Sequence, residues 1–131
     1  MSEIDEIDKK IKPLIDIMNS TGWIDTISSC EGHPGRNYHS TPQVAFFCKW
    51  SKIKLLSKIL NVIDEKIEEY RIPVIMKLIW VSNEQIQGCQ WEAPQGYLSL
   101  DMSFDRIRDL RHDNQMLLDI VIDSFREGVM K

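Results

Sequence analysis

Residues 97–102 read Tyr97-Leu98-Ser99-Leu100-Asp101-Met102, and this stretch decides the fold class. Leucine or methionine occupies every second position. Because successive side chains of a strand point to opposite faces of a sheet, the alternation predicts a strand with one face in the core. Runs of β-branched and apolar residues bounded by turn residues predict three more strands, over 26–30, 43–48 and 74–81.

Three stretches have helical spacing of isoleucine and leucine: 4–18 before the strands, 53–67 between the second and third strands, and 117–125 after the last strand. Pro13 has no N–H group, so the first helix is either kinked there or begins near it. Ser51 and Asp113 are expected to cap the second and third helices. Loops are expected over 31–41 and 82–96, and a charged connection over 103–112.

The element order αββαββα predicts an α+β fold. We expect a mostly antiparallel four-stranded sheet, with three helices mainly on one face and the other face open to a ligand or a partner. A length of 131 residues is typical of one domain, so residues 1–131 are expected to fold as a single unit.

The charge and the cysteines limit the classes of function. The chain has 16 basic and 20 acidic residues, a net charge of −4. An acidic chain repels polyphosphate unless it carries a local basic patch, so the charge disfavours tRNA as a partner but leaves a small RNA-contacting face open. No apolar run is long enough to cross a bilayer, and the acidic, amphipathic N-terminus does not resemble a secretory signal. Together with an odd number of cysteines, these features predict a cytoplasmic protein without a membrane partner.

The segment Ser28-Ser29-Cys30-Glu31-Gly32-His33 is the strongest candidate for a functional site. It follows a predicted strand, and the end of a strand holds side chains rigidly. Gly32 allows a backbone to approach a ligand closely. Cys30 and His33 could form a thiolate–imidazole pair. Equally, Cys30 could be a small core thiol and His33 an exposed turn residue.

A zinc site is a weaker interpretation. Ligand types suited to zinc occur at Cys30, His33, His39 and Cys48. Only the Cys-x-x-His pair has a familiar spacing, and no second pair completes a tetrahedral site. We therefore expect no bound metal.

Asp101 lies on the polar side of its predicted strand. A carboxylate on the open face of a sheet could act as an acid, a base or a hydrogen-bond acceptor for a substrate. The commoner alternative is a solvated strand face.

Three stretches resemble the third wybutosine-synthesis protein family, whose members are S-adenosylmethionine-dependent tRNA methyltransferases. Residues 11–20 resemble the family's Pro-Leu-x-x-x-Ile-Asn-Ser helix. Residues 26–33 resemble its Thr-x-Ser-Ser-Cys-Ser-Gly-Arg signature, and residues 98–101 its Leu-Arg-Leu-Asp strand. The chain departs from the family at Glu31, His33 and Ser99, where the family has Ser, Arg and Arg.

The resemblance implies the fold and a pocket lined by Ser28, Ser29, Cys30, Gly32 and Asp101. With it we take Cys30, His33 and Asp101 as candidate catalytic residues. The candidate ligand-binding residues are Ser28, Ser29, Glu31, Gly32, Arg36 and Ser99.

Two functions remain open. The first is an enzyme-like protein that binds a small ligand at the Cys30 loop, with S-adenosylmethionine as one candidate and methyl transfer as one candidate reaction. The second is a non-catalytic domain that uses its open sheet face to form a homodimer or to bind a partner. Because the family's two arginines are missing, we do not expect tRNA methylation to be the main activity.

Overall fold

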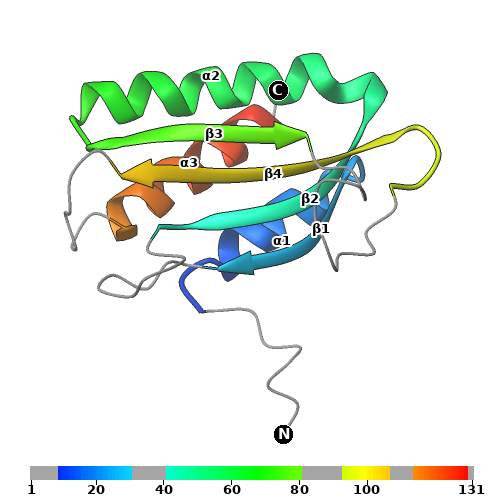
Figure 1. Cartoon of the computed structure of the whole chain (residues 1–131), viewed down its shortest axis with the longest axis horizontal. Helices are drawn as coiled ribbons and strands as arrows, with labels where there is room; N and C mark the ends of the chain where they lie inside the picture. The colour runs from blue at the N-terminus through cyan, green and yellow to red at the C-terminus, as the bar shows by residue number, and fades with distance from the viewer. Residues whose placement is uncertain (1–8, 31–40, 81–92, 107–113, 130–131) are drawn as a thin grey trace, which may run out of the picture.

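A computed structural model of the chain describes residues 9–30, 41–80, 93–106 and 114–129 (Figure 1). The elements, in chain order, are α1 (Lys12–Ser20), β1 (Ile24–Cys30), β2 (Gln43–Lys49), a 3-10 turn η2 (Trp50–Lys52), α2 (Ile53–Glu69), β3 (Val74–Trp80), β4 (Tyr97–Arg106) and α3 (Asn114–Val129). The predicted α+β class and the order αββαββα are confirmed.

The four strands form one antiparallel sheet in the order β1-β2-β4-β3. Figure 1 shows α1 and α3 behind this sheet and α2 running alongside β3. Among the described elements the helices therefore lie on one side of the strands, and we call the other side, which is turned to the viewer, the open face. In the ranges that the structure describes, no helix has both the length and the apolar character needed to cross a bilayer.

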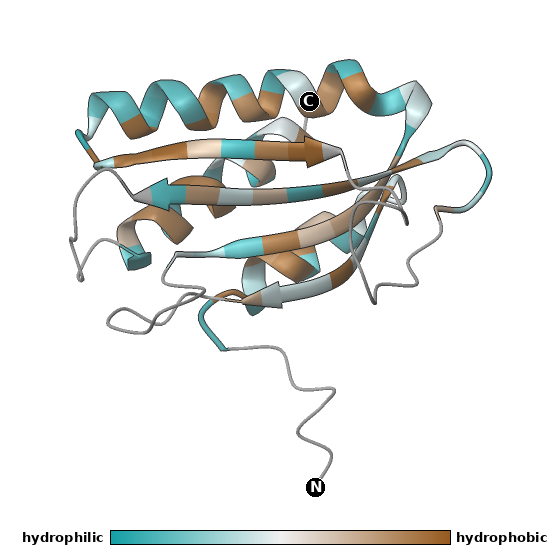
Figure 2. Ribbon diagram, viewed as in Figure 1, coloured by the Kyte–Doolittle hydropathy of each residue, from teal (hydrophilic) through white to brown (hydrophobic). Residues whose placement is uncertain are grey.

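The alternation predicted from residues 97–102 is confirmed. Leu98, Leu100 and Met102 are buried in the core, and Phe104 continues the pattern. Their neighbours on β2, Val44, Phe46 and Cys48, are buried on the same side. The helices contribute the other half of the core, chiefly Leu14, Ile15, Met18, Leu56, Ile59, Ile63, Leu117, Val121 and Phe125. Figure 2 shows this as hydrophobic colour on the side of α2 toward β3.

The structure decides between the two alternatives for the start of α1 and corrects the predicted N-cap of α2. Pro13 stands in the first turn of α1, which begins at Lys12. A missing N–H costs no helical hydrogen bond there, so the second of the two alternatives for Pro13 holds. Ser51 does not cap α2. It lies inside η2, and the N-cap position falls on Lys52, which makes no side-chain capping bond.

The expected connection over 103–112 was wrong at its start, because β4 continues to Arg106. Ser103 pairs with Lys77 and Asp105 with Ile75, so the neighbouring strand β3 extends the ladder. Asp113, like the greater part of the expected loops, lies outside the described residues.

Candidate functional site

The open face carries a set of polar side chains at one level of the sheet. The strand register places Cys30 beside Gln43, and Ser28 beside Ala45, which in turn lies beside Asp101. Ser99 lies two residues before Asp101 on β4, so both are on this face. We refer to Ser28, Cys30, Gln43, Ser99 and Asp101 as the polar cluster.

An irregularity in β1 turns Ser28 and Cys30 onto the open face. Thr26 pairs with the core residue Phe46, and the register then shifts by one between Thr26 and Ser28. On the helix-facing side, Thr26 exchanges hydrogen bonds with the side chain of Asn19 in α1, at 2.9 and 3.0 Å. Without this register shift, regular alternation would leave Ser28 and Cys30 on the same side as Thr26.

Gln43 holds the Asp101 carboxylate. Its side-chain Nε2 donates to the two oxygens of Asp101, at 3.3 and 3.2 Å. Both side chains are half-buried. An amide donor on a neighbouring strand therefore fixes the orientation of this carboxylate, as a binding or reacting group requires.

Ser99 is the unusual member of the cluster. Its side chain is only 5% exposed, although it lies on the face that the helices do not cover. Among the described residues its Oγ is a buried side-chain atom without a hydrogen-bond partner. Leaving a buried hydroxyl unpaired costs about 1–3 kcal/mol, so such an atom calls for an explanation.

The predicted site residues are only partly brought together. Ser28, Cys30, Ser99 and Asp101 share the open face, with Cys30 half-buried as the last residue of β1. Ser29 pairs with Val44 and is on the helix-facing side. The remaining predicted residues, Glu31, Gly32, His33 and Arg36, lie outside the described residues.

Gln43 was missed by sequence reasoning. The one available signal was a polar residue at the head of the apolar run 43–48. Its meaning depends on the pairing of β2 with β4, which brings Gln43 within reach of Asp101 across 58 positions of sequence.

The cysteines of the described strands face different environments. Cys48 is fully buried on the helix-facing side, and burial raises the pKa of its thiol to about 11. Cys30 is on the opposite face, so these two thiols do not share a site. The described part of the chain contains no group of three or more His, Cys, Asp or Glu side chains that could hold a metal ion.

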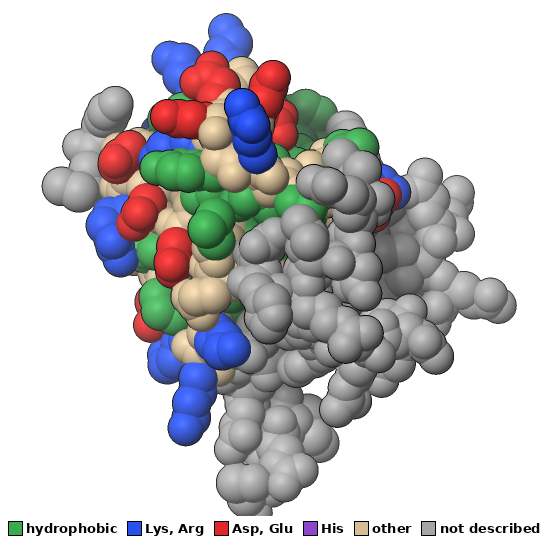
Figure 3. Space-filling view, turned by 90° about the vertical axis from the view of Figure 1, so that its left-hand side faces the viewer, with side chains coloured by type: hydrophobic (Ala, Val, Ile, Leu, Met, Phe, Trp, Pro, Cys, Tyr) green, Lys and Arg blue, Asp and Glu red, His purple; other side chains and the backbone are tan. Residues whose placement is uncertain are grey.

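Two hollows lined by described residues lie away from the polar cluster. One, of about 580 Å³, is between the end of α2 and the start of β3, with Asp64 and Met76 among its lining residues. The other, of about 280 Å³, is between α2 and α3 beside Gly128. Figure 3 looks onto the end of the molecule where α2 finishes, and shows exposed hydrophobic side chains among acidic and basic ones.

Comparison with protein-family models, with curated proteins and with solved structures finds no match. The geometry of the polar cluster is therefore the basis for a functional proposal.

Proposed function

We propose that this protein binds a small polar ligand on the open face of its sheet, at the polar cluster. The observation that carries the proposal is the buried Oγ of Ser99, which lacks a partner among the described residues. An alanine at position 99 would avoid the cost of burying an unpaired hydroxyl. A hydroxyl kept at a cost of about 1–3 kcal/mol is accounted for if a bound molecule supplies its hydrogen bond.

The neighbours of Ser99 support a ligand that donates hydrogen bonds. Asp101 lies on the same face and presents carboxylate oxygens, which accept hydrogen bonds when ionised. Gln43 orients this carboxylate before any ligand arrives. Phe47, beside Ser99, is half-buried and supplies apolar surface on the same face. A molecule with hydroxyl or amine donors and one flat apolar part fits these groups in kind.

S-adenosylmethionine is the first candidate ligand. It has two ribose hydroxyls that a carboxylate such as Asp101 can accept from, and an adenine ring that apolar surface can contact. The resemblance of residues 11–20, 26–33 and 98–101 to a family of methyltransferases supports the same choice. If bound, this cofactor would supply a methyl group for transfer, and Cys30 would lie on the face that holds it.

Thermal unfolding in the presence of S-adenosylmethionine, S-adenosylhomocysteine and adenosine tests the proposal. A ligand at about 100 times its dissociation constant adds about 2.7 kcal/mol of apparent stability. Asp101→Asn should lose this gain. Asp105→Asn, on the same strand and face, removes the same charge outside the cluster and should keep it. Equal stabilisation of both variants, or no stabilisation by any of the three compounds, would count against this ligand class at this site.

We do not propose tRNA as the substrate. A tRNA presents a dense row of phosphates, and this chain has more acidic than basic residues. Methyl transfer from labelled S-adenosylmethionine to tRNA that carries the wybutosine precursor is expected to be at background level. Robust transfer that disappears in Asp101→Asn would show that the acidic charge was given too much weight.

A further inference from the structure

Strand β3 is an edge strand with apolar residues on both of its faces. Its sequence is Val74-Ile75-Met76-Lys77-Leu78-Ile79-Trp80. Ile75 and Ile79 are 57% and 43% exposed on the open face, and Leu78 is 39% exposed on the other side. Figure 2 shows this strand as hydrophobic along most of its length. An exposed apolar edge strand is a template for pairing with another chain.

Among the described residues, the outer edge of β3 carries backbone groups without a hydrogen-bond partner. Its ladder partner is β4, from Val74 opposite Arg106 to Trp80 opposite Leu100. Within the described residues, no other backbone hydrogen bond involves Ile75–Trp80. Figure 1 shows β3 as the outermost strand of the sheet, with α2 running alongside it on the side away from β4.

Charge does not protect this edge strongly. Lysines on edge strands discourage pairing with other chains, and Lys77 is the one charged residue of β3. Its Nζ, however, lies 3.2 Å from Oδ2 of Asp105 on β4. The lysine therefore leans inward across the sheet, and its charge is balanced by its own chain.

The residue types of β3 are nearly symmetric about Lys77. Reading outward in both directions gives Met76 and Leu78, then Ile75 and Ile79. A two-fold axis makes each residue of one copy face its mirror position in the other. Such an axis at Lys77 sets Ile75 opposite Ile79 on the open face, and Met76 opposite Leu78 on the other.

The register centred on Lys77 sets the two Lys77 side chains opposite each other, each paired with its own Asp105, and other registers match the apolar residues less well. In an antiparallel pair, directly opposite residues share a face, so the register changes in steps of two. A step in either direction sets Lys77 opposite an isoleucine of the other copy. The register centred on Lys77 is the one that matches all four exposed or half-exposed apolar residues with apolar partners.

The hollow between the end of α2 and the start of β3 has room for a side chain of such a neighbour. Its lining includes Val74, Met76 and the apolar side chains of Ile67 and Ile72. In the register centred on Lys77, Leu78 of the second copy lies beside Met76 and enters this space of about 580 Å³. We propose that two copies of this chain associate by antiparallel pairing of their β3 strands about a two-fold axis at Lys77, forming one continuous sheet.

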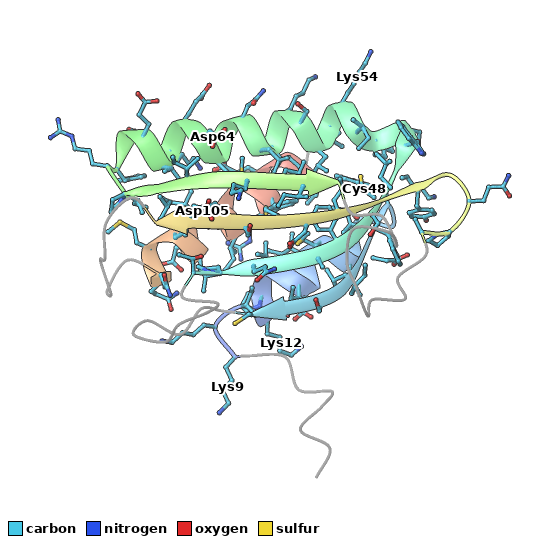
Figure 4. The ribbon with its side chains drawn as sticks, in the orientation of Figure 1. Lys9, Lys12, Cys48, Lys54, Asp64 and Asp105 are labelled. Carbon is cyan, nitrogen blue, oxygen red and sulfur yellow. The ribbon has the colours of Figure 1, made fainter. Side chains whose placement is uncertain are left out.

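A disulfide tests the register. Directly opposite residues in an antiparallel pair have Cα atoms about 4.5–5.5 Å apart, which suits a disulfide. Lys77→Cys should give a covalent dimer under mild oxidation, reversed by reductant. Lys54→Cys, an exposed position on α2 that points away from the sheet (Figure 4), is the matched control. The unaltered chain gives the background from its own cysteines.

Sedimentation equilibrium tests the association itself. The unaltered chain should show a reversible monomer–dimer equilibrium. Ile75→Lys changes two symmetric contacts and should raise the dissociation constant about ten-fold or more, with an unchanged circular dichroism spectrum. The proposal fails if the unaltered chain is monomeric throughout, or if Lys77→Cys forms no more covalent dimer than Lys54→Cys. If the unaltered chain is monomeric, a strand of a different protein becomes the alternative partner for the edge of β3.

Discussion

The side-chain amide of Gln43, at the start of β2, donates to both carboxylate oxygens of Asp101 in the middle of β4. The register sets Gln43 opposite Ser103, not Asp101, so this contact runs diagonally across the two strands. It holds the carboxylate on the face that carries the unpaired hydroxyl of Ser99. An oriented acceptor and a hydroxyl without a partner on one face are the basis of the proposed ligand site.

Replacing Ser99 by alanine should stabilise the protein without ligand. The substitution removes a buried hydroxyl that has no partner among the described residues, so the free energy of unfolding should rise by about 1 kcal/mol. Urea denaturation measures the change. Ser124→Ala is the control, because the Oγ of Ser124 is also buried but donates to the carbonyl of Ile120 at 2.7 Å. The expectation would be wrong if Ser124→Ala raised the free energy of unfolding and Ser99→Ala lowered it.

Cys30 and Cys48 should differ in reactivity. Cys48 is buried with a pKa raised to about 11 by desolvation, so at pH 8 about one thiol in a thousand is ionised. Cys30 is half-buried at the end of β1. Alkylation of the native protein at pH 8, followed by mass spectrometry of peptides, should modify Cys30 at least about ten-fold faster. In denaturant the two rates should converge. Equal rates in the native protein would contradict the assigned burial.

Gly128 on α3 allows a close approach to α2. A Cβ at this position would overlap Cγ1 of Ile59 and lie 2.7 Å from its Cδ1. Alanine favours a helix by about 1 kcal/mol over glycine, whereas overpacking costs about 1–3 kcal/mol. Gly128→Ala should therefore lower the free energy of unfolding by about 1 kcal/mol.

A double-variant cycle separates these two effects. Ile59→Ala removes the atoms that an alanine at Gly128 would meet, so the double variant should be less destabilised than the sum of the two single changes. Additive effects, or a stabilising Gly128→Ala, would show that the two helices separate without cost.

The ionised carboxylate of Asp64 should lower the free energy of unfolding at neutral pH. Partial desolvation at the hollow beside β3 raises the pKa of its carboxyl above the ordinary 3.8; Figure 4 shows the position of Asp64 on α2. The folded state then favours the protonated form, and the stability that protonation adds is present below pH 3.8 and lost as the pH rises through the higher folded-state pKa. Asp64→Asn should be more stable at pH 7, by less than about 0.5 kcal/mol because the side chain is largely exposed.

The difference between Asp64→Asn and the unaltered chain should vanish as the pH falls below 3.8. Denaturation series at several pH values follow this change. Glu65→Gln, at the exposed neighbouring position, removes the same charge away from the hollow. An equal gain from Glu65→Gln would assign the effect to net charge instead of burial.

The sequence pattern predicted the element order and the core face of β4, because local alternation and helical spacing report burial directly. Leu98, Leu100 and Met102 are buried as their positions require. The extent of β4 was missed, since Ser103 and Asp105 become strand residues through pairing with β3. Polar side chains on an open face do not distinguish a strand from a connection.

The candidate site was harder to predict, because it depends on pairing between distant segments. Cys30 and Asp101 were identified as candidates, but their common face results from the register shift after Thr26. Gln43 becomes relevant only through β2–β4 pairing. The lack of a partner for Ser99 depends on side chains from several strands, which no local pattern reports.

A nuclear magnetic resonance screen of small polar fragments tests the claim that the polar cluster is a ligand site. Backbone amide shifts of the ¹⁵N-labelled chain show where each fragment binds. Fragments with hydroxyl or amine donors are predicted to shift the amides of Gln43, Ser99 and Asp101, and to lose this effect in Asp101→Asn. Binding confined to the hollows at Asp64 and Gly128, with the cluster unperturbed, would contradict the claim.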